Sequence, residues 1–195
     1  MLSMRAPQVA YKIYTKTGDK GVSSLYSGER RAKTDDIFNA LGTSDELSSH
    51  IGVALEYCAS PDLQELSNRL QKIQCILQEA NSVIATPRRH EEGVDKKMEF
   101  SPNYTVNLEN WIDEMENELP KLTSFILPSG GLASSHLHVC RTVCRRAERM
   151  IVHLSSKKEC NSDVSIFFNR LSDFLFTAAR FACFKSGKKE FIYKK

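Results

Sequence analysis

Apolar residues along this chain return every three to four positions over long stretches, which is the period of an amphipathic α-helix. The pattern predicts a first helix over residues 35–58 and a second over 63–84, where steps of three and four alternate like a heptad seam. A third helix is predicted over 108–119, because Pro120 cannot continue it. A fifth is predicted over 164–182. The fourth, between these last two, carries its own apolar stripe: Leu137, Cys140, Cys144, Ala147 and Ile151.

Five helices with seams of this spacing pack at shallow angles, which is typical of a left-handed, roughly antiparallel bundle. We therefore predict an all-α fold in a single domain over residues 11–195. Residues 86–103 contain two prolines, a glycine and many charges, which favours a flexible linker. Residues 1–10 are predicted to be a leader. With Arg5 and no acidic residue they are similar to the end of a transit peptide, although ten residues are too few to identify one.

Composition narrows the class of protein further. A net charge of +3, with 27 basic and 24 acidic residues, is too small for a general nucleic-acid binder, so none is expected as a partner. No apolar run approaches the ~18 residues of a membrane span, so no membrane association is expected. The six cysteines lack a CxxC spacing and four lie at apolar helix positions, which favours reduced thiols in an intracellular compartment.

The fourth predicted helix also carries a dense group of arginines just after the Ser-Gly-Gly turn at 129–131. At about 100° per residue, one stripe holds four charged side chains: Arg141, Arg145, Glu148 and Arg149. Arg146 points elsewhere on the same helix. Like charges four residues apart repel, so the stripe favours a partner with several negative charges. The fifth helix offers Asn169 and Asp173 to face the stripe and orient its guanidinium groups for phosphate.

Other features are open to two interpretations. Residues 11–24 have no helical period, and their glycines, lysines and hydroxyls suit an anion-binding loop, although a flexible leader would explain them as well. Asp45 could orient an arginine, but its sequence context alone favours a helix cap. Phe125 borders the glycine turn and is a candidate pocket residue. The remaining phenylalanines of this region are assigned to the core: Phe167, Phe168, Phe174, Phe176 and Phe181.

Five segments occur in an order that resembles the PduO-type ATP:cob(I)alamin adenosyltransferases, especially their mitochondrial animal branch. The segments are 15–21, 42–47, 125–131, 145–149 and 169–173. The resemblance implies transfer of the 5′-deoxyadenosyl group of ATP to cob(I)alamin, with release of triphosphate. It also implies a homotrimer with active sites between subunits, a mitochondrial matrix location, and a methylmalonyl-CoA mutase and a reductase as protein partners. Ser129 before the paired glycines and Val22 depart from the commonest bacterial pattern.

The resemblance also implies roles for particular residues. One subunit would bind the triphosphate through its ATP-binding loop at 11–33, with Thr15, Lys16, Thr17, Gly18, Ser23, Ser24 and Lys33. The next subunit would contribute Arg145, Arg146, Ala147, Glu148, Arg149 and Asn169. On the cobalamin side, Asp45 and Arg141 would form an intersubunit ion pair, Phe125 would cover the lower axial side of the cobalt, and Asp173 would lie nearby.

Catalysis would then consist of stabilising the leaving group. Lys16, Arg145, Arg149 and a Mg²⁺ ion carried by ATP would offset the charge that gathers on the triphosphate, and no protein ligand to the metal is assigned. Phe125 would exclude an axial ligand and so ease reduction of the cobalt. Two alternatives remain. One is a module that binds ATP and adenosylcobalamin and delivers the cofactor to a mutase, and the other is a structural bundle whose arginines form salt bridges.

Overall fold

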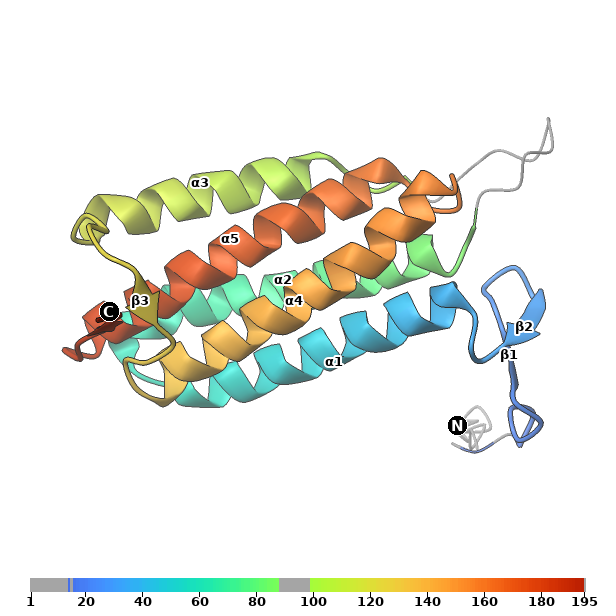
Figure 1. Ribbon diagram of the computed structural model, residues 1–195, viewed down its shortest axis with the longest axis horizontal. Helices are drawn as coiled ribbons and strands as arrows, with labels where there is room; N and C mark the ends of the chain where they lie inside the picture. Colours follow the sequence, from blue (N-terminus) through green and yellow to red (C-terminus); the bar gives the residue numbers. More distant parts are fainter. Residues whose placement is uncertain (1–13, 15, 88–98, 195) are drawn as a thin grey trace, which may run out of the picture.

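Five long helices dominate the computed structural model, which describes residues 14, 16–87 and 99–194 (Figure 1). Their bounds are α1 Asp36–Tyr57, α2 Gln64–Ile84, α3 Asn103–Glu118, α4 Leu132–Ser156 and α5 Ser162–Lys185, with a short 3₁₀ helix at Pro61–Leu63. The predicted all-α bundle of five helices is confirmed. The predicted leader, Thr15 and most of the predicted linker lie outside the described residues.

The helices pack in the spatial order α2, α1, α4, α5, α3, and α4 runs antiparallel to both of its neighbours (Figure 1). The apolar stripe predicted on α4 forms the centre of this packing, because Leu137, Cys140 and Cys144 are fully buried. Phe167, Phe168 and Phe174 of α5 are buried, as predicted. Because the core occupies one side of α4, the arginines of this helix lie on its other side. None of the described helices is both long and apolar enough to cross a membrane.

Two local predictions were wrong. Helix α1 begins at Asp36, and the side chain of Asp35 caps it by accepting a hydrogen bond from the N–H of Ile37. Asp45 therefore lies inside α1 and is not a cap. The linker predicted over 86–103 is solvated only in part, since Phe100 is buried with its ring 5.3 Å from that of Phe167. Phe100 could not be recognised from periodicity, because a single buried residue in a loop has no period.

Two short pairs of strands were not predicted. Strands β1 (Val22–Ser24) and β2 (Arg30–Ala32) pair antiparallel before α1. Strand β3 (Ile126–Leu127) pairs with β4 (Phe191–Ile192), so the segment before α4 lies beside the carboxyl-terminal residues. Strands of two or three residues are too short to show the alternation that identifies a strand in a sequence. This second pair of strands lies next to Phe125, whose carbonyl accepts a hydrogen bond from the N–H of Tyr193.

The six cysteines are present as thiols, of which five are buried and Cys75 is exposed. Burial raises the pKa of Cys58 to about 11 and that of Cys140 to about 12, so these thiols stay protonated at neutral pH. They act as small apolar residues of the core.

Candidate active site

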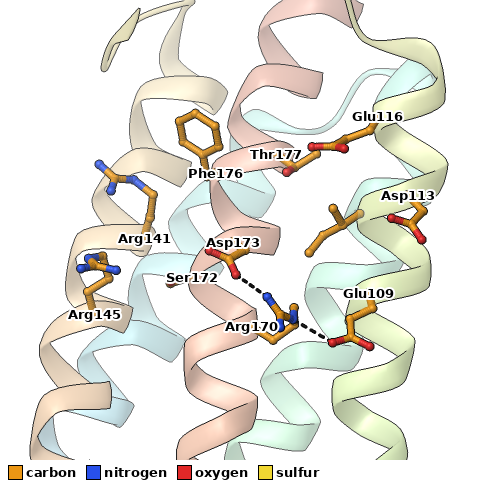
Figure 2. A pocket seen from close by; sticks show the side chains of 11 residues that line it. Glu109, Asp113, Glu116, Arg141, Arg145, Arg170, Ser172, Asp173, Phe176 and Thr177 are labelled. Carbon is orange, nitrogen blue, oxygen red and sulfur yellow. Dashed lines mark hydrogen bonds and ion pairs between the residues drawn. The ribbon is translucent and has the colours of Figure 1, made fainter. Parts of the chain in front are cut away.

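Two arginines of α4, Arg141 and Arg145, border a cavity of about 470 Å³ between α3, α4 and α5. Figure 2 shows Arg141 and Arg145 on one side of this cavity, with Asp173 and Phe176 of α5 in the middle. The opposite wall is acidic, and its carboxylates come from α3: Glu109, Asp113 and Glu116. The cavity therefore separates a cationic wall from an anionic one.

Neither Arg141 nor Arg145 forms an ion pair with any residue in the described ranges. The Nε of Arg141 is buried and has no hydrogen-bond partner there, and burial together with the charge of Arg145 lowers the pKa of Arg141. Two guanidinium groups left without a carboxylate are an unfavourable arrangement unless an anion binds between them. The structure thus supports the prediction that this stripe binds an anionic ligand.

Asp173 does not orient these arginines, contrary to the sequence-based expectation. Its carboxylate accepts a hydrogen bond from Nη1 of Arg170 at 2.6 Å, and Nε of Arg170 donates to Glu109 at 2.9 Å (Figure 2). Arg170 is thus the residue that neutralises Asp173. The signal for this pair was the spacing of three residues on one helix, which favours an ion pair between Arg170 and Asp173.

Asn169 does contact the arginine helix, as predicted, although through its acidic member. Its Nδ2 donates a hydrogen bond to Oε1 of Glu148 at 2.7 Å and so orients this carboxylate. In the sequence, Glu148 lies between Arg145 and Arg149. Arg149 is exposed and donates to the backbone carbonyl of Arg145 at 3.2 Å. Ala147 is fully buried, so its side chain has no surface to offer a ligand.

Arg146 lies on a different side of α4, as predicted, and pairs with Glu46 of α1. Together with Arg149 it borders a second cavity of about 280 Å³. Residues of α1 and α4 complete its wall: Asp36, Asn39, Met150 and His153. In this cavity wall Asp36 accepts hydrogen bonds from Lys157 at 2.8 Å and contacts His153 at 3.2 Å.

Residues 16–21 form a turn, and the side chain of Lys33 packs against it. The side chain of Lys33 lies over Gly18, where any Cβ would be 3.1 Å from the Lys33 amine. The backbone N–H of Lys33 donates to the carbonyl of Gly21 at 2.9 Å, and Arg30 donates to that of Thr17 at 2.8 Å. Lys16 is exposed nearby, with its backbone in the left-handed region. A glycine turn bordered by lysines is a suitable phosphate-binding site.

This turn and the arginine stripe are apart within one chain. Strand β1 carries Ser23 and Ser24. This strand and β2 lie beyond the amino-terminal end of α1 (Figure 1). Arg141 and Arg145 lie near the middle of α4. Asp45 is exposed on α1, and no ion pair joins it to Arg141 among the described residues. Within the described residues, neither Lys16 nor Lys33 borders the two cavities that the α4 arginines line.

Phe125 is 79% exposed and borders an apolar cavity of about 370 Å³. The other lining residues are Leu122, Thr123, Ser124, Ile126 and Phe176. Phe176 also borders the arginine cavity, so one ring joins the two. Phe176 was predicted to lie in the core, and its place between the two cavities was not predicted. Its spacing of three residues from Asp173 and seven from Asn169 places it on their face of α5, and that spacing was the available signal.

His138 of α4 lies behind Phe176 and was not singled out from the sequence. It is 4% exposed, its ring centroid is 6.0 Å from that of Phe176, and its Nδ1 has no partner among the described residues. Burial, together with the nearby charge of Arg141, lowers the pKa of His138 to about 4. The imidazole is therefore neutral at physiological pH, which avoids a third positive charge beside Arg141.

Within the described ranges, no three His, Cys, Asp or Glu side chains are grouped so that they could hold a metal ion. The cavity described here combines two guanidinium groups with the ring of Phe176, which leads to the exposed ring of Phe125. Such a site can bind a polyanion next to a large apolar ligand.

Known proteins are similar to this chain in sequence and in fold. A sequence family described as cobalamin adenosyltransferase matches residues 13–182. The corrinoid adenosyltransferase MMAB of Mus musculus is 53% identical over 94% of this chain and 78% of its own length. The Homo sapiens protein of the same name is 52% identical over 99% of this chain and 77% of its own length. A variant of the PduO-type ATP:corrinoid adenosyltransferase from Lactobacillus reuteri, solved in complex with cobalamin and ATP, superposes with a TM-score of 0.87. It is 39% identical, and the match covers 94% of this chain and all of that one.

Proposed function

This chain belongs to the cobalamin adenosyltransferase family, and we propose that it transfers the 5′-deoxyadenosyl group of ATP to cob(I)alamin. The products are adenosylcobalamin and triphosphate. The observation that carries this proposal is the pair of guanidinium groups without carboxylate partners, Arg141 and Arg145, beside a cavity that Phe176 joins to the exposed ring of Phe125. A module that only binds and delivers the cofactor is not favoured, because the relatives are named as transferases.

The chemistry needs little from the protein beyond binding and charge. Co(I) is a strong nucleophile that forms a bond with the 5′ carbon of ATP while the bond from this carbon to the triphosphate oxygen breaks. Negative charge then collects on the leaving triphosphate. Arg145, Arg149 and Lys16 stabilise this charge more than that of the bound ATP, which lowers the barrier. Phe125 occupies the other side of the corrin and keeps an axial ligand from the cobalt.

The site is shared between subunits of a homotrimer. In this arrangement the turn at residues 16–21 and Lys33 of one subunit close on the triphosphate held by Arg145, Arg149 and Asn169 of the next. Asp45 of one subunit pairs with Arg141 of its neighbour. Lys16 and Lys33 border neither cavity that the α4 arginines line, and Arg141 has no ion-pair partner among the described residues. Both observations support the arrangement.

Mg²⁺ enters the site bound to the phosphates of ATP, because this ion is usually held by substrate phosphates with few protein ligands. The protein acts in the mitochondrial matrix, where a reductase supplies cob(I)alamin and a methylmalonyl-CoA mutase uses the product. The resemblance to animal corrinoid adenosyltransferases supports this location and these partners.

The reaction is tested by mixing the purified protein anaerobically with ATP, Mg²⁺ and chemically reduced cob(I)alamin. We expect the absorbance of adenosylcobalamin to appear at a rate that depends on protein concentration. A folded protein that binds ATP but gives no adenosylcobalamin would refute the enzymatic function and would favour the delivery module.

The shared site is tested by mixing subunits that carry Lys33→Ala with subunits that carry Arg145→Ala. Each variant alone lacks one half of every site, but a random mixed trimer contains intact sites at about one quarter of its interfaces. We therefore expect the mixture to recover about a quarter of the wild-type activity. Mixed oligomers without any recovery would show that both residues act within one subunit.

A further inference from the structure

Ser129 is a buried hydroxyl residue at the junction of the two strands beside Phe125. It is 7% exposed, and its Oγ donates to the carbonyl of Leu127 at 2.8 Å. The same Oγ accepts a hydrogen bond from the backbone N–H of Phe191 at 2.8 Å. The strand pairing ends at Leu127 and Phe191, so this hydroxyl continues the ladder where β3 itself has ended.

The strand held in this way contacts Phe125. The N–H of Tyr193, just after β4, donates to the carbonyl of Phe125 at 2.8 Å. The rings of Phe125 and Tyr193 meet edge to face, with centroids 6.5 Å apart. Because the Phe125 side chain is 79% exposed, the protein core does not fix its position. Its backbone pairing with the carboxyl-terminal segment is the contact that does.

The position of Ser129 is itself tightly determined. Its carbonyl accepts a hydrogen bond from the hydroxyl of Ser134 at 2.6 Å. The next residue, Gly130, has φ +94° and lies so close to α5 that a Cβ would be 2.5 Å from Sγ of Cys183. A rigid turn of this kind presents the Ser129 hydroxyl to β4 in one orientation.

We propose that Ser129 is a positioning residue for the cobalamin side of the reaction. Its hydroxyl holds the carboxyl-terminal strand β4 against β3, and this strand fixes the backbone at Phe125, whose ring covers one side of the corrin. The inference rests on the proposed function. It predicts an effect on cobalamin and on the axial ligation of its cobalt, and no effect on ATP.

The test is a double-mutant cycle between the two ends of one hydrogen bond. Ser129→Ala removes the acceptor. Phe191→Pro removes the donor, and proline is tolerated at the first residue of a strand. Phe191→Ala is the matched control, because it removes the same ring, which is 67% exposed, but keeps the N–H. Ser165→Ala, which removes a hydroxyl bonded to a carbonyl of α5, controls for the loss of a hydroxyl elsewhere.

Two readouts separate positioning from general damage. The KM values for cobalamin and for ATP are measured with pre-formed cob(I)alamin. Electron paramagnetic resonance of cob(II)alamin bound with ATP gives the fraction of cobalt that lacks an axial nitrogen.

Loss of one partly buried hydrogen bond changes an equilibrium constant by about tenfold. We expect Ser129→Ala to raise the cobalamin KM by about this factor and to lower the fraction of cobalt without axial nitrogen, with the ATP KM unchanged. Phe191→Pro should match it, and the double variant should be no worse than either single variant. Both controls should behave as wild type.

Other outcomes would overturn the inference. If Ser129→Ala changes neither the cobalamin KM nor the resonance spectrum, or if the effects of Ser129→Ala and Phe191→Pro add in full, Ser129 does not act through β4. These results would leave the proposed function intact, because wild type would still form adenosylcobalamin. Failure of the wild type itself to convert cob(I)alamin would instead refute the proposed function.

Discussion

Replacing His138 by leucine should make the protein less sensitive to acid. His138 is 4% exposed beside Arg141, and its pKa is lowered to about 4 from the ordinary 6.5. At a pH between about 4 and 6.5, His138 is protonated in the unfolded chain and neutral in the folded protein. The free energy of unfolding therefore contains a contribution from neutral His138 that is complete above pH 6.5 and is lost as the pH falls toward 4.

The size of this loss follows from the two pKa values. Between pH 7.5 and pH 5.0 the folded protein should lose about 2 kcal/mol of stability through His138 alone. The leucine variant cannot lose it. At pH 7.5 the variant should differ from wild type by less than about 1.5 kcal/mol, because leucine has a similar size and replaces a ring whose Nδ1 has no partner among the described residues.

Urea unfolding followed by circular dichroism, at one fixed protein concentration and at both pH values, measures the difference. His136, whose pKa is also lowered by burial, is present in both proteins, so its contribution cancels. Equal losses of stability in wild type and variant would refute the reasoning and would mean that His138 is accessible to protons in the folded protein.

Three further changes test the site directly. Arg145→Ala should lower kcat by about 100-fold or more with the oligomer intact, because the leaving triphosphate loses a guanidinium partner, and near-normal turnover in a steady-state assay would contradict this role. Phe125→Ala should slow the reaction strongly when Co(II) is reduced on the protein and much less with pre-formed Co(I), whereas equal loss in the two assays would refute the axial role. Gly130→Ala should lower the free energy of unfolding by about 2 kcal/mol or more, because φ is +94° and the new methyl group would meet Cys183, and an unchanged denaturation midpoint would show that this turn can relax.

The helices could be predicted from the sequence because each buries a long stripe whose period repeats. The α4 stripe ending at Ile151 is buried as expected, and the arginines lie on the other side of that helix. The contact between Asn169 and Glu148 follows from the same periodicity, since both residues face the seam between α4 and α5. Period and charge were sufficient for these features.

The rest depends on contacts between distant segments, which have no local period. Ser129 meets Phe191, and Phe100 enters the core beside Phe167, through pairings that only the folded chain brings together. The wrong assignment of Asp173 has a different cause. Arg170 lies three residues before Asp173 on the same helix, and this local ion pair forms in place of one with the α4 arginines.

The central claim is that the cobalt attacks the 5′ carbon of ATP and that the arginines stabilise an intact triphosphate as it leaves. Phosphorus NMR of an anaerobic reaction with cob(I)alamin, quenched at several times, measures the leaving group most directly. We expect one triphosphate for each adenosylcobalamin formed, with both appearing at the same rate. Pyrophosphate and phosphate in place of triphosphate from the earliest time, or triphosphate without adenosylcobalamin, would contradict the mechanism.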